Sequence, residues 1–343
     1  MSERRKLTLK DIAKDLGISV STASRALKAH PDIAQETIQM VKDYAAKHNY
    51  VPNIIAVNFR KSRTKNIGLI VPELVHHFFS TVISGSIDEA KKSGYNILVS
   101  QSNDFLEDEK VACRTMMASS VDGLLISISN ETYDGDHILE FIDEGKPVIQ
   151  FDKILEKLPV PKVIVDDFEG GYSATKHLID QGCKQIAHIA GRKDVLNACE
   201  RMKGYKKALE DHQIPFKEEY IRYCESITEE EGELFMEEFL TLTNPPDAVF
   251  CITDLVALGV IKALKSKGIS IPSQIAIVGF SNWKLAEIVS PSLTSIDQHG
   301  YQMGVEAVRM LINKLEDKNF EIPDTLELKT RLVVRDSSIK ALS

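Results

Sequence analysis

Three side chains near the amino terminus could donate hydrogen bonds to the edges of base pairs. At about 100° per residue, Ser21, Arg25 and Lys28 fall on one side of an α-helix, and Ala23 and Ala26 fall on the opposite side. An arginine can donate two hydrogen bonds to O6 and N7 of guanine, and a short hydroxyl permits close approach to the base. This polar, cationic face predicts major-groove recognition. An ordinary helical hairpin is the alternative.

A second group of polar and aromatic side chains follows apolar runs of strand length. In parallel α/β sheets, ligands bind beyond the carboxyl ends of the strands, and aromatic faces with convergent polar groups suit a small hydroxylated molecule. The group consists of His76, His77, Phe78, Phe79, Gln101, Ser102, Asp152, Arg201, Asp254, Ser281, Asn282 and Trp283. Structural roles are the alternatives: Phe78 or Phe79 in a core, Asp254 as the cap of a helix starting at Leu255, and Arg201 paired with Glu200 or another acid.

Motifs for catalysis are not evident. The sequence has no dinucleotide fingerprint, no phosphate loop ending in Gly-Lys-Ser/Thr, no nucleophile elbow and no His-Glu-x-x-His motif. His76 and His77 are adjacent, which is a poor spacing for a metal, and no third ligand is evident. Asp166 and Asp167, taken as strand neighbours, would point to opposite faces and could not share a proton. We therefore expect no enzyme, no metal and no cofactor.

The candidate base-reading face needs a helical scaffold, and the sequence predicts one over residues 1–50. A Thr8-x-x-Asp11 opening can cap a first helix over about 8–16, Gly17 suits a tight turn, and Ser19 can cap a second helix starting at Val20. A third helix is expected over about 33–48. Residues 54–60 form too short a segment for an isolated helix, so DNA and a partner copy would have to order it. The sequence thus predicts a helix-turn-helix followed by a hinge over 51–65.

The ligand-binding side chains require a sheet, and residues 66–343 alternate strand-like and helical stretches. This pattern is typical of two doubly wound parallel sheets in an α/β fold. We expect the chain to cross between the two subdomains near 165, 295 and 325. The predicted strands are 67–71, 96–100, 123–128, 148–151, 163–165, 186–190, 248–252 and 275–280.

Charge divides the chain at the same place. Residues 1–65 hold 13 Lys and Arg against 6 Asp and Glu, whereas the remainder holds 29 against 44. A basic head on an acidic body indicates that a polyanion binds at one end only. The five cysteines form no Cys-x-x-Cys pair, and neither a signal peptide nor a membrane span is evident. A cytoplasmic protein is therefore expected, without a membrane partner.

Motifs along the whole chain resemble those of the LacI/GalR family of bacterial transcription regulators. The resemblance lies in the segments 7–13, 17–19, 24–25, 49–53, 64–72, 170–174, 186–191, 201–205, 254–259, 278–280, 291–296 and 332–338. It implies a homodimer that binds a palindromic double-stranded DNA operator, with a body shaped like a periplasmic sugar-binding protein. It also implies a repressor of carbohydrate metabolism whose operator affinity is controlled by a small-molecule effector, a sugar or sugar derivative.

The resemblance also assigns site residues by position. The implied DNA contacts are Thr8, Leu9, Ser19, Val20, Ser21, Thr22, Ser24, Arg25, Tyr50, Asn53, Ala56, Phe59 and Arg60. The implied effector contacts are His77, Phe79, Gln101, Asp152, Arg201, Asp254, Ser281, Trp283 and Gln298.

Four positions depart from the family pattern. Ala34 replaces the usual capping Ser before the third helix, so that this helix start can rely on Asp32 instead. Phe59 stands where most relatives place a leucine wedge in the minor groove, so the kink geometry can differ. Thr253 stands where Asn is common and Ser281 where Asp is common, which removes two groups that often hold sugar hydroxyls. These departures leave open an effector that is not a simple neutral sugar.

Effector control is expected to act through the paired hinges. Ligand closes the cleft, changes the distance between the hinges and so decides whether they can fold into the minor groove. DNA binding either weakens or tightens, depending on the state that the ligand prefers. A transport-type solute receptor and an enzyme on a doubly wound scaffold are the rival interpretations. The basic head argues against the first, and turnover of a metabolite would reveal the second.

Overall fold

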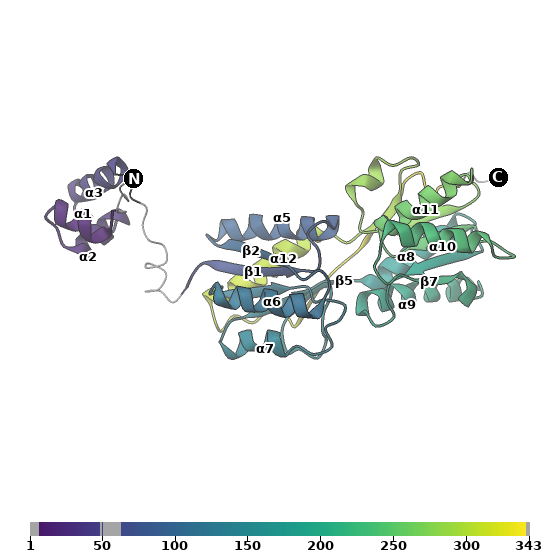
Figure 1. Cartoon of the computed structure of the whole chain (residues 1–343), viewed down its shortest axis with the longest axis horizontal. Coiled ribbons are helices and arrows are strands. Elements are labelled where there is room, and N and C mark those ends of the chain that lie inside the picture. The colour runs from purple at the N-terminus through teal and green to yellow at the C-terminus, as the bar shows by residue number, and fades with distance from the viewer. Residues whose placement is uncertain (1–6, 49, 51–62, 341–343) are drawn as a thin grey trace. The chain divides into compact units, whose positions relative to one another are not determined.

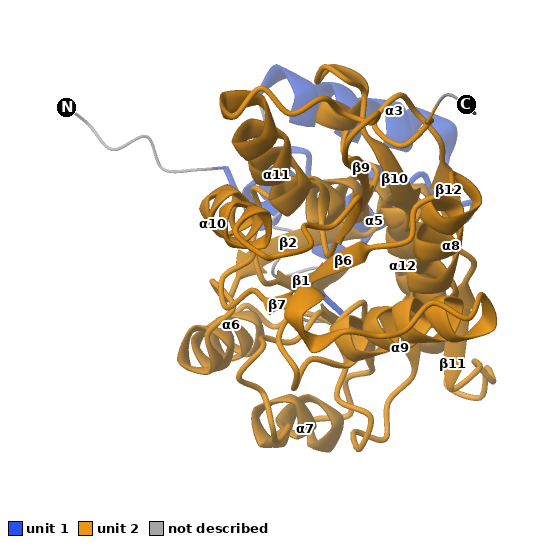
Figure 2. Cartoon of the chain, turned by 90° about the vertical axis from the view of Figure 1, so that its right-hand side faces the viewer, with its two compact units in different colours: residues 1–64 blue, residues 65–343 orange. Residues whose placement is uncertain are grey.

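The computed structural model describes residues 7–48, 50 and 63–340. The chain divides into two compact units, residues 1–64 and residues 65–343, coloured separately in Figure 2. The boundary lies within the segment expected to be the hinge and linker. Among the described residues, no helix is long and apolar enough to cross a membrane.

In the described part of the first unit, three helices surround a small apolar core. These are α1 (Leu9–Asp15), α2 (Val20–Leu27) and α3 (Gln35–Lys47). The core is formed by Ile12, Ala26, Ile38, Val41 and Ala45. The third helix begins two residues later than expected, after Ala34, which lacks a side-chain cap.

The second unit, here called the body, holds two six-stranded sheets. The strand order is β11-β5-β4-β3-β1-β2 in the sheet of the first half and β12-β10-β9-β8-β6-β7 in that of the second half. All neighbouring strands are parallel except β10 and β12, which run antiparallel. The bounds in the first half are β1 (Asn66–Val71), β2 (Asn96–Gln101), β3 (Gly123–Ile126), β4 (Val148–Phe151), β5 (Lys162–Val165) and β11 (Thr325–Leu328). The bounds in the second half are β6 (Ile186–Ala190), β7 (Ile221–Tyr223), β8 (Ala248–Cys251), β9 (Ala276–Phe280), β10 (Thr294–Asp297) and β12 (Arg331–Val333).

Helices cover both sheets (Figure 1). Those of the first half are α5 (His77–Lys92), α6 (Leu106–Ala118), α7 (Asp136–Asp143) and α12 (Gly300–Glu316). Those of the second half are α8 (Asp167–Asp180), α9 (Leu196–Asp211), α10 (Glu229–Leu240) and α11 (Asp254–Ser266), with the short helices η1 (Glu218–Tyr220) and η2 (Lys284–Glu287).

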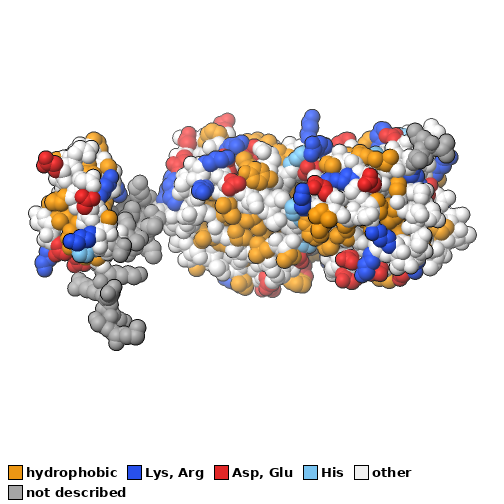
Figure 3. Space-filling view, turned by 90° about the horizontal axis from the view of Figure 1, so that it is seen from above, with side chains coloured by type: hydrophobic (Ala, Val, Ile, Leu, Met, Phe, Trp, Pro, Cys, Tyr) orange, Lys and Arg blue, Asp and Glu red, His pale blue; other side chains and the backbone are white. Residues whose placement is uncertain are grey.

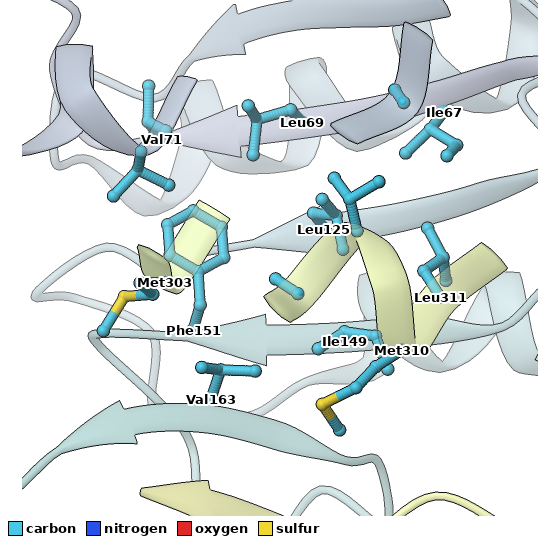
Figure 4. Close-up of a cluster of buried hydrophobic side chains, with 14 of the residues drawn as sticks. Ile67, Leu69, Val71, Leu125, Ile149, Phe151, Val163, Met303, Met310 and Leu311 are labelled. Carbon is cyan, nitrogen blue, oxygen red and sulfur yellow. The ribbon is translucent and has the colours of Figure 1, made fainter. Parts of the chain in front are cut away.

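The two halves are joined by three chain crossings. The chain leaves the first half after β5, returns from β10 to α12, and passes again from β11 to β12. In the first half, α12 packs against the sheet. Figure 4 shows Met303, Met310 and Leu311 of this helix among Leu69, Phe151 and other strand side chains.

Glycines let three helix pairs approach closely. A Cβ atom on Gly304 of α12 would lie 2.1 Å from the carbonyl oxygen of Val82 on α5, and one on Gly204 of α9 would lie 2.1 Å from that of Phe168 on α8. Gly259 of α11 makes an equally close approach to α10. Because both members of a pair touch through backbone, each pair is a stiff unit.

Candidate nucleic-acid interface and ligand cleft

Helix α2 presents one polar face to solvent and one apolar face to the core. Ala23 and Ala26 are fully buried, whereas Val20, Ser21 and Arg25 are exposed. The periodicity predicted this division because the two sets lie on opposite sides of an α-helix. The exposed set is free to meet a groove of DNA.

The start of α2 is held by its predicted cap. The hydroxyl of Ser19 accepts a hydrogen bond from the backbone nitrogen of Thr22 at 3.0 Å, and its oxygen also lies 2.7 Å from that of Ser21. Thr8 caps α1 in the same way, with Asp11 completing a capping box. Both helix starts therefore offer backbone N–H groups and hydroxyls, which suit phosphate oxygens.

The other predicted DNA contacts fall in three places. Leu9, Thr22 and Ser24 are half-buried at the edges of the helices, and Tyr50 packs against the core of the first unit. Asn53, Ala56, Phe59 and Arg60 lie outside the described residues.

A cleft of about 320 Å³ lies between the two halves of the body. Its volume matches small-molecule sites, which begin near 300 Å³. Side chains that line it follow the carboxyl ends of β1, β2, β3 and β4 in the first half and of β6, β7, β8 and β9 in the second. Predicted effector contacts that line it are Phe79, Asp152, Arg201, Ser281 and Gln298.

Four predicted effector contacts do not line the cleft. Gln101 accepts a hydrogen bond from the backbone nitrogen of Leu74 at 3.1 Å. The ring of His77 lies 6.3 Å from that of Trp283, and burial lowers the pKa of His77. Figure 3 shows histidine side chains where the two halves of the body meet. Asp254 is buried behind the cleft wall.

Asp254 supports the segment that carries Ser281. Its carboxylate accepts hydrogen bonds from the backbone nitrogen of Trp283 at 2.5 Å and from the hydroxyl of Ser295 at 2.6 Å. Burial raises the pKa of Asp254 to about 7. The cap of α11 is Thr253, so the alternative that Asp254 caps a helix starting at Leu255 is wrong.

Arg201 is held in place by three contacts beneath the cleft. Its Nε donates to Oδ1 of Asp167 at 2.8 Å, its Nη1 donates to the carbonyl of Ile252 at 2.9 Å, and its guanidinium lies 3.7 Å from the centre of the Phe280 ring. The expected alternative partner, Glu200, pairs instead with Lys203.

Asp166 and Asp167 are not strand neighbours, because β5 ends at Val165, so the predicted reason why they share no proton is wrong; their carboxylates nevertheless have different partners. Asp166 caps α8 by accepting a hydrogen bond from the backbone nitrogen of Glu169, and Asp167 is the first residue of the helix. Burial raises the pKa of Asp167 to about 6, although the neighbouring Arg201 acts in the opposite direction.

Asp152 places a buried carboxylate at the cleft. It is 8% exposed, and its backbone has a φ of 58°, which turns the chain directly after β4. Burial raises its pKa, while the charges of Arg201 and Lys153 lower it. A ligand donor that reaches this carboxylate would replace part of the hydration lost on burial.

Further cleft residues were missed in the sequence. They include Asn103, Asp104 and Phe105 after β2, Asn130 and Glu131 after β3, Lys153 after β4, and Arg192 and Asn197 after β6. The residues after β3 and β6 were missed because the rule was not applied to those strands, and those after β2 and β4 because the selection stopped one or two residues past the strand end.

Comparisons with known proteins find relatives of both the helical first unit and the body that holds the cleft. Residues 8–53 match the model of bacterial regulatory proteins of the lacI family, and residues 175–338 match a periplasmic binding protein-like domain. The HTH-type transcriptional regulator RegA of Clostridium saccharobutylicum is 33% identical over 97% of this chain and 99% of its own length. The HTH-type transcriptional repressor PurR of Actinobacillus pleuropneumoniae is 32% identical over 96% of this chain and 98% of its own length.

This chain belongs to the lacI family. A solved structure of the transcriptional regulator CelR in complex with cellobiose is similar, with a TM-score of 0.73 and 27% identity over 97% of this chain and all of that one. The lacI-family chain is thus a transcriptional regulator with an effector-binding body, and its relatives are regulators rather than enzymes. Among the described residues, no group of three or more His, Cys, Asp or Glu side chains could hold a metal ion.

Proposed function

We propose that this chain is a cytoplasmic repressor that binds a palindromic operator as a homodimer. Its affinity for the operator decreases or increases when a small molecule binds. Residues 1–50 form the DNA-binding domain, 51–65 the hinge helix and linker, and 66–343 the effector-binding and dimerisation domain. A ligand that prefers one state of the cleft shifts the equilibrium between operator-competent and incompetent states.

The exposed face of α2 carries the DNA-binding part of this proposal. Arg25 is exposed on the side opposite Ala26, which is fully buried, and Ser21 lies one turn before it on the same face. A guanidinium held on a rigid helix can bind guanine through two hydrogen bonds, which contributes about 1–3 kcal/mol of discrimination.

Selection of bound DNA from a random pool tests this role directly. The full chain should enrich a palindromic sequence, and Arg25→Ala should lose that enrichment because the base contact is gone. Lys47→Ala is a charge-matched control, since Lys47 lies exposed at the end of α3. It should weaken binding to all sequences alike and keep the selected motif. Undiminished selection by Arg25→Ala would defeat the proposed role of this residue.

An apolar surface of the body fits the proposed homodimer. Exposed apolar side chains include Ile87 on α5, Val99 on β2 and Tyr301 on α12 in the first half, and Leu285 and Ile288 in the second. The view in Figure 3, which faces α5, shows apolar side chains gathered over both halves. Exposed apolar patches that are larger than those on typical monomers mark protein–protein contacts. Sedimentation analysis should give a dimer, and Ile288→Glu should shift it toward monomer.

The charges of the cleft restrict the effector that we propose. Each basic side chain that lines it lies near a carboxylate: Lys153 near Asp104 at 2.9 Å, Arg192 near Asp194 at 2.9 Å, Arg201 near Asp167 at 2.8 Å and His76 near Glu73 at 3.1 Å. Carboxylates of Glu131, Asp152 and Glu225 also line the cleft. An anionic ligand would have to displace an acid from its partner, so a neutral or amine-bearing effector is favoured.

Hydrogen-bond acceptors are available at the same place. Among the described residues, the buried Oδ1 of Asn130 has no hydrogen-bond partner, and Asp152 offers carboxylate oxygens. A ligand rich in hydroxyl or ammonium donors would satisfy them. The cellobiose bound by the similar CelR supports a saccharide without net negative charge.

Calorimetry with matched sugars tests this charge preference. Cellobiose, glucose and glucosamine are compared with glucose 6-phosphate and gluconate, with Asp152→Asn as the variant and Glu210→Gln, on the outer part of α9, as its control. A phosphate or carboxylate should weaken binding by about tenfold or more relative to the neutral sugar. Tighter binding of an anionic sugar than of its neutral counterpart would contradict the proposed effector class.

A further inference from the structure

Three side chains meet where the linker enters the body. Nζ of Lys65 donates a hydrogen bond to Oε1 of Glu316 at 2.7 Å and lies 3.9 Å from the centre of the Tyr95 ring. The hydroxyl of Tyr95 donates to the same Oε1 of Glu316 at 2.8 Å. Each member thus contacts the other two. The three side chains are here called the anchor.

The backbone of Lys65 is also held on both sides. Its nitrogen donates a hydrogen bond to Oδ2 of Asp122 at 2.9 Å, and its carbonyl accepts one from the nitrogen of Asn96 at 2.8 Å. Its φ is 59°, in the left-handed region, which a residue other than glycine rarely adopts without support from its surroundings. The chain direction at this residue is therefore set by contacts with the body.

Helix α12 joins the anchor to the ligand cleft. It ends at Glu316 and begins at Gly300, two residues after Gln298, which lines the cleft. Gln298 directly follows β10 and accepts a hydrogen bond at 2.8 Å from the hydroxyl of Ser281, which follows the neighbouring strand β9 of the second half. A helix of 17 residues spans about 25 Å. One continuous element therefore connects the crossing between the halves to Lys65.

Two packing features make this helix stiff. Met303 and Leu311 are fully buried against the sheet of the first half (Figure 4), and Gly304 brings the backbone of α12 against that of α5. A shift at Gln298 would therefore move Glu316 with the whole helix rather than dissipate along it.

We propose that Lys65, Tyr95 and Glu316 are positioning residues for operator binding. The anchor sets the direction in which the linker leaves the body, and α12 carries cleft movement to it. This inference rests on the proposed function as a DNA-binding regulator. It assigns these three residues a role in DNA binding that acts through the linker and requires no contact with DNA.

Two substitutions that change the charge in opposite directions distinguish this role from a change in the electrostatic attraction between the protein and DNA. Lys65→Met removes a positive charge and Glu316→Gln removes a negative one, so attraction to DNA alone would make the first variant weaker and the second stronger. The anchor predicts that both variants bind the operator more weakly, by about fivefold or more, the lower limit of typical allosteric coupling. Because either substitution breaks the shared contact between Lys65 and Glu316, the losses should not add, and the double variant should bind about as well as the weaker single variant.

The measurement is fluorescence anisotropy of the full-length chain with operator DNA taken from the random-pool selection. Lys65→Arg keeps the charge and the contact with Tyr95, and should bind like the wild type. Lys176→Met, which breaks the exposed pair with Asp180 on α8, is the matched control and should change affinity less than twofold. Circular dichroism and thermal unfolding verify that each variant is folded, which is expected because Lys65 and Glu316 are 38% and 51% exposed.

The results distinguish failure of the anchor proposal from failure of the proposed function on which it rests. If the wild type selects no DNA sequence, the proposed function fails. If the wild type binds its selected operator and either single variant stays within twofold of it, or Glu316→Gln binds more tightly, the anchor proposal is overturned.

Discussion

Nε of Arg201 donates a hydrogen bond to Oδ1 of Asp167 at 2.8 Å, and both side chains are more than nine-tenths buried. Arg201 comes from α9 and Asp167 from the first turn of α8, the helix pair that is packed through Gly171 and Gly204. The guanidinium at the cleft is thus oriented by a helix pair whose backbones touch. Ligand recognition and packing of this half depend on the same residues.

Loss of one member of this pair should cost much more than loss of a surface pair. Asp167→Leu leaves the Arg201 charge buried without its acid, and should lower the free energy of unfolding by about 3–5 kcal/mol in urea titrations. Asp180→Leu, which removes the exposed partner of Lys176, should cost less than about 1 kcal/mol. The double variant Asp167→Leu/Arg201→Met should recover part of the loss, and equal losses for the two single variants would contradict this account.

Close packing of α12 on α5 makes Gly304 intolerant of any side chain. A Cβ atom there would lie 2.1 Å from the carbonyl oxygen of Val82, so backbone must move. Gly304→Ala should therefore destabilise the body by about 1–3 kcal/mol or more in thermal or urea unfolding. Ser84→Ala on the exposed side of α5 is the control, with an expected change within about 0.5 kcal/mol. A neutral Gly304→Ala would show that the two helices are not packed this closely.

Helix α3 starts without a side-chain cap, which offers a simple gain in stability. Ala34 has φ and ψ of −57° and 141°, compatible with a capping residue, but its own side chain makes no capping hydrogen bond. Ala34→Ser should stabilise the first unit by about 1 kcal/mol, measured by thermal unfolding. Ala46→Ser, exposed within the same helix, should instead be neutral or slightly destabilising. A gain at both positions would show that capping is not the cause.

The sequence was most informative where strands are buried on both faces. All eight predicted strands exist, and central parallel strands such as β8 and β9 read as continuous apolar runs. Four strands were missed: β7, β11 and β12 are short strands at sheet edges, and β10 begins with buried Thr294 and Ser295. Apolar periodicity carries no information about such strands.

The residues of the candidate cleft were predicted only in part, because the sequence shows positions after strands but does not show which side chains pair. The position of a residue after a strand can be seen in the sequence, which is why Asp152 and Ser281 were selected correctly as lining residues. The partners of a charge cannot be seen, since the acid beside Arg201 lies 34 residues away and the donors to Asp254 lie 29 and 41 residues away. Only the fold shows that Asp254 supports the wall and that Arg201 is neutralised.

His188 gives the body a stability that depends on pH. It lies fully buried in β6, where Nδ1 is 2.9 Å from the carbonyl oxygen of Phe250 and the ring stacks on that of Phe250. Burial lowers its pKa to about 4, from an ordinary value of 6.5. Between these values the unfolded chain binds a proton that the folded chain does not, so the free energy of unfolding falls as the pH is lowered from 6.5 toward 4.

From pH 7 to pH 5 this one residue should cost the wild type about 2 kcal/mol. His188→Phe keeps an aromatic ring but cannot be protonated, so it should lose less stability over the same interval, even if it starts from a lower value at pH 7. Urea unfolding of both proteins at each pH gives the two differences. His177, whose pKa is also lowered by burial, contributes equally to both proteins and cancels. Equal losses in the wild type and the variant would mean that His188 accepts its proton in the folded body as readily as in the unfolded chain.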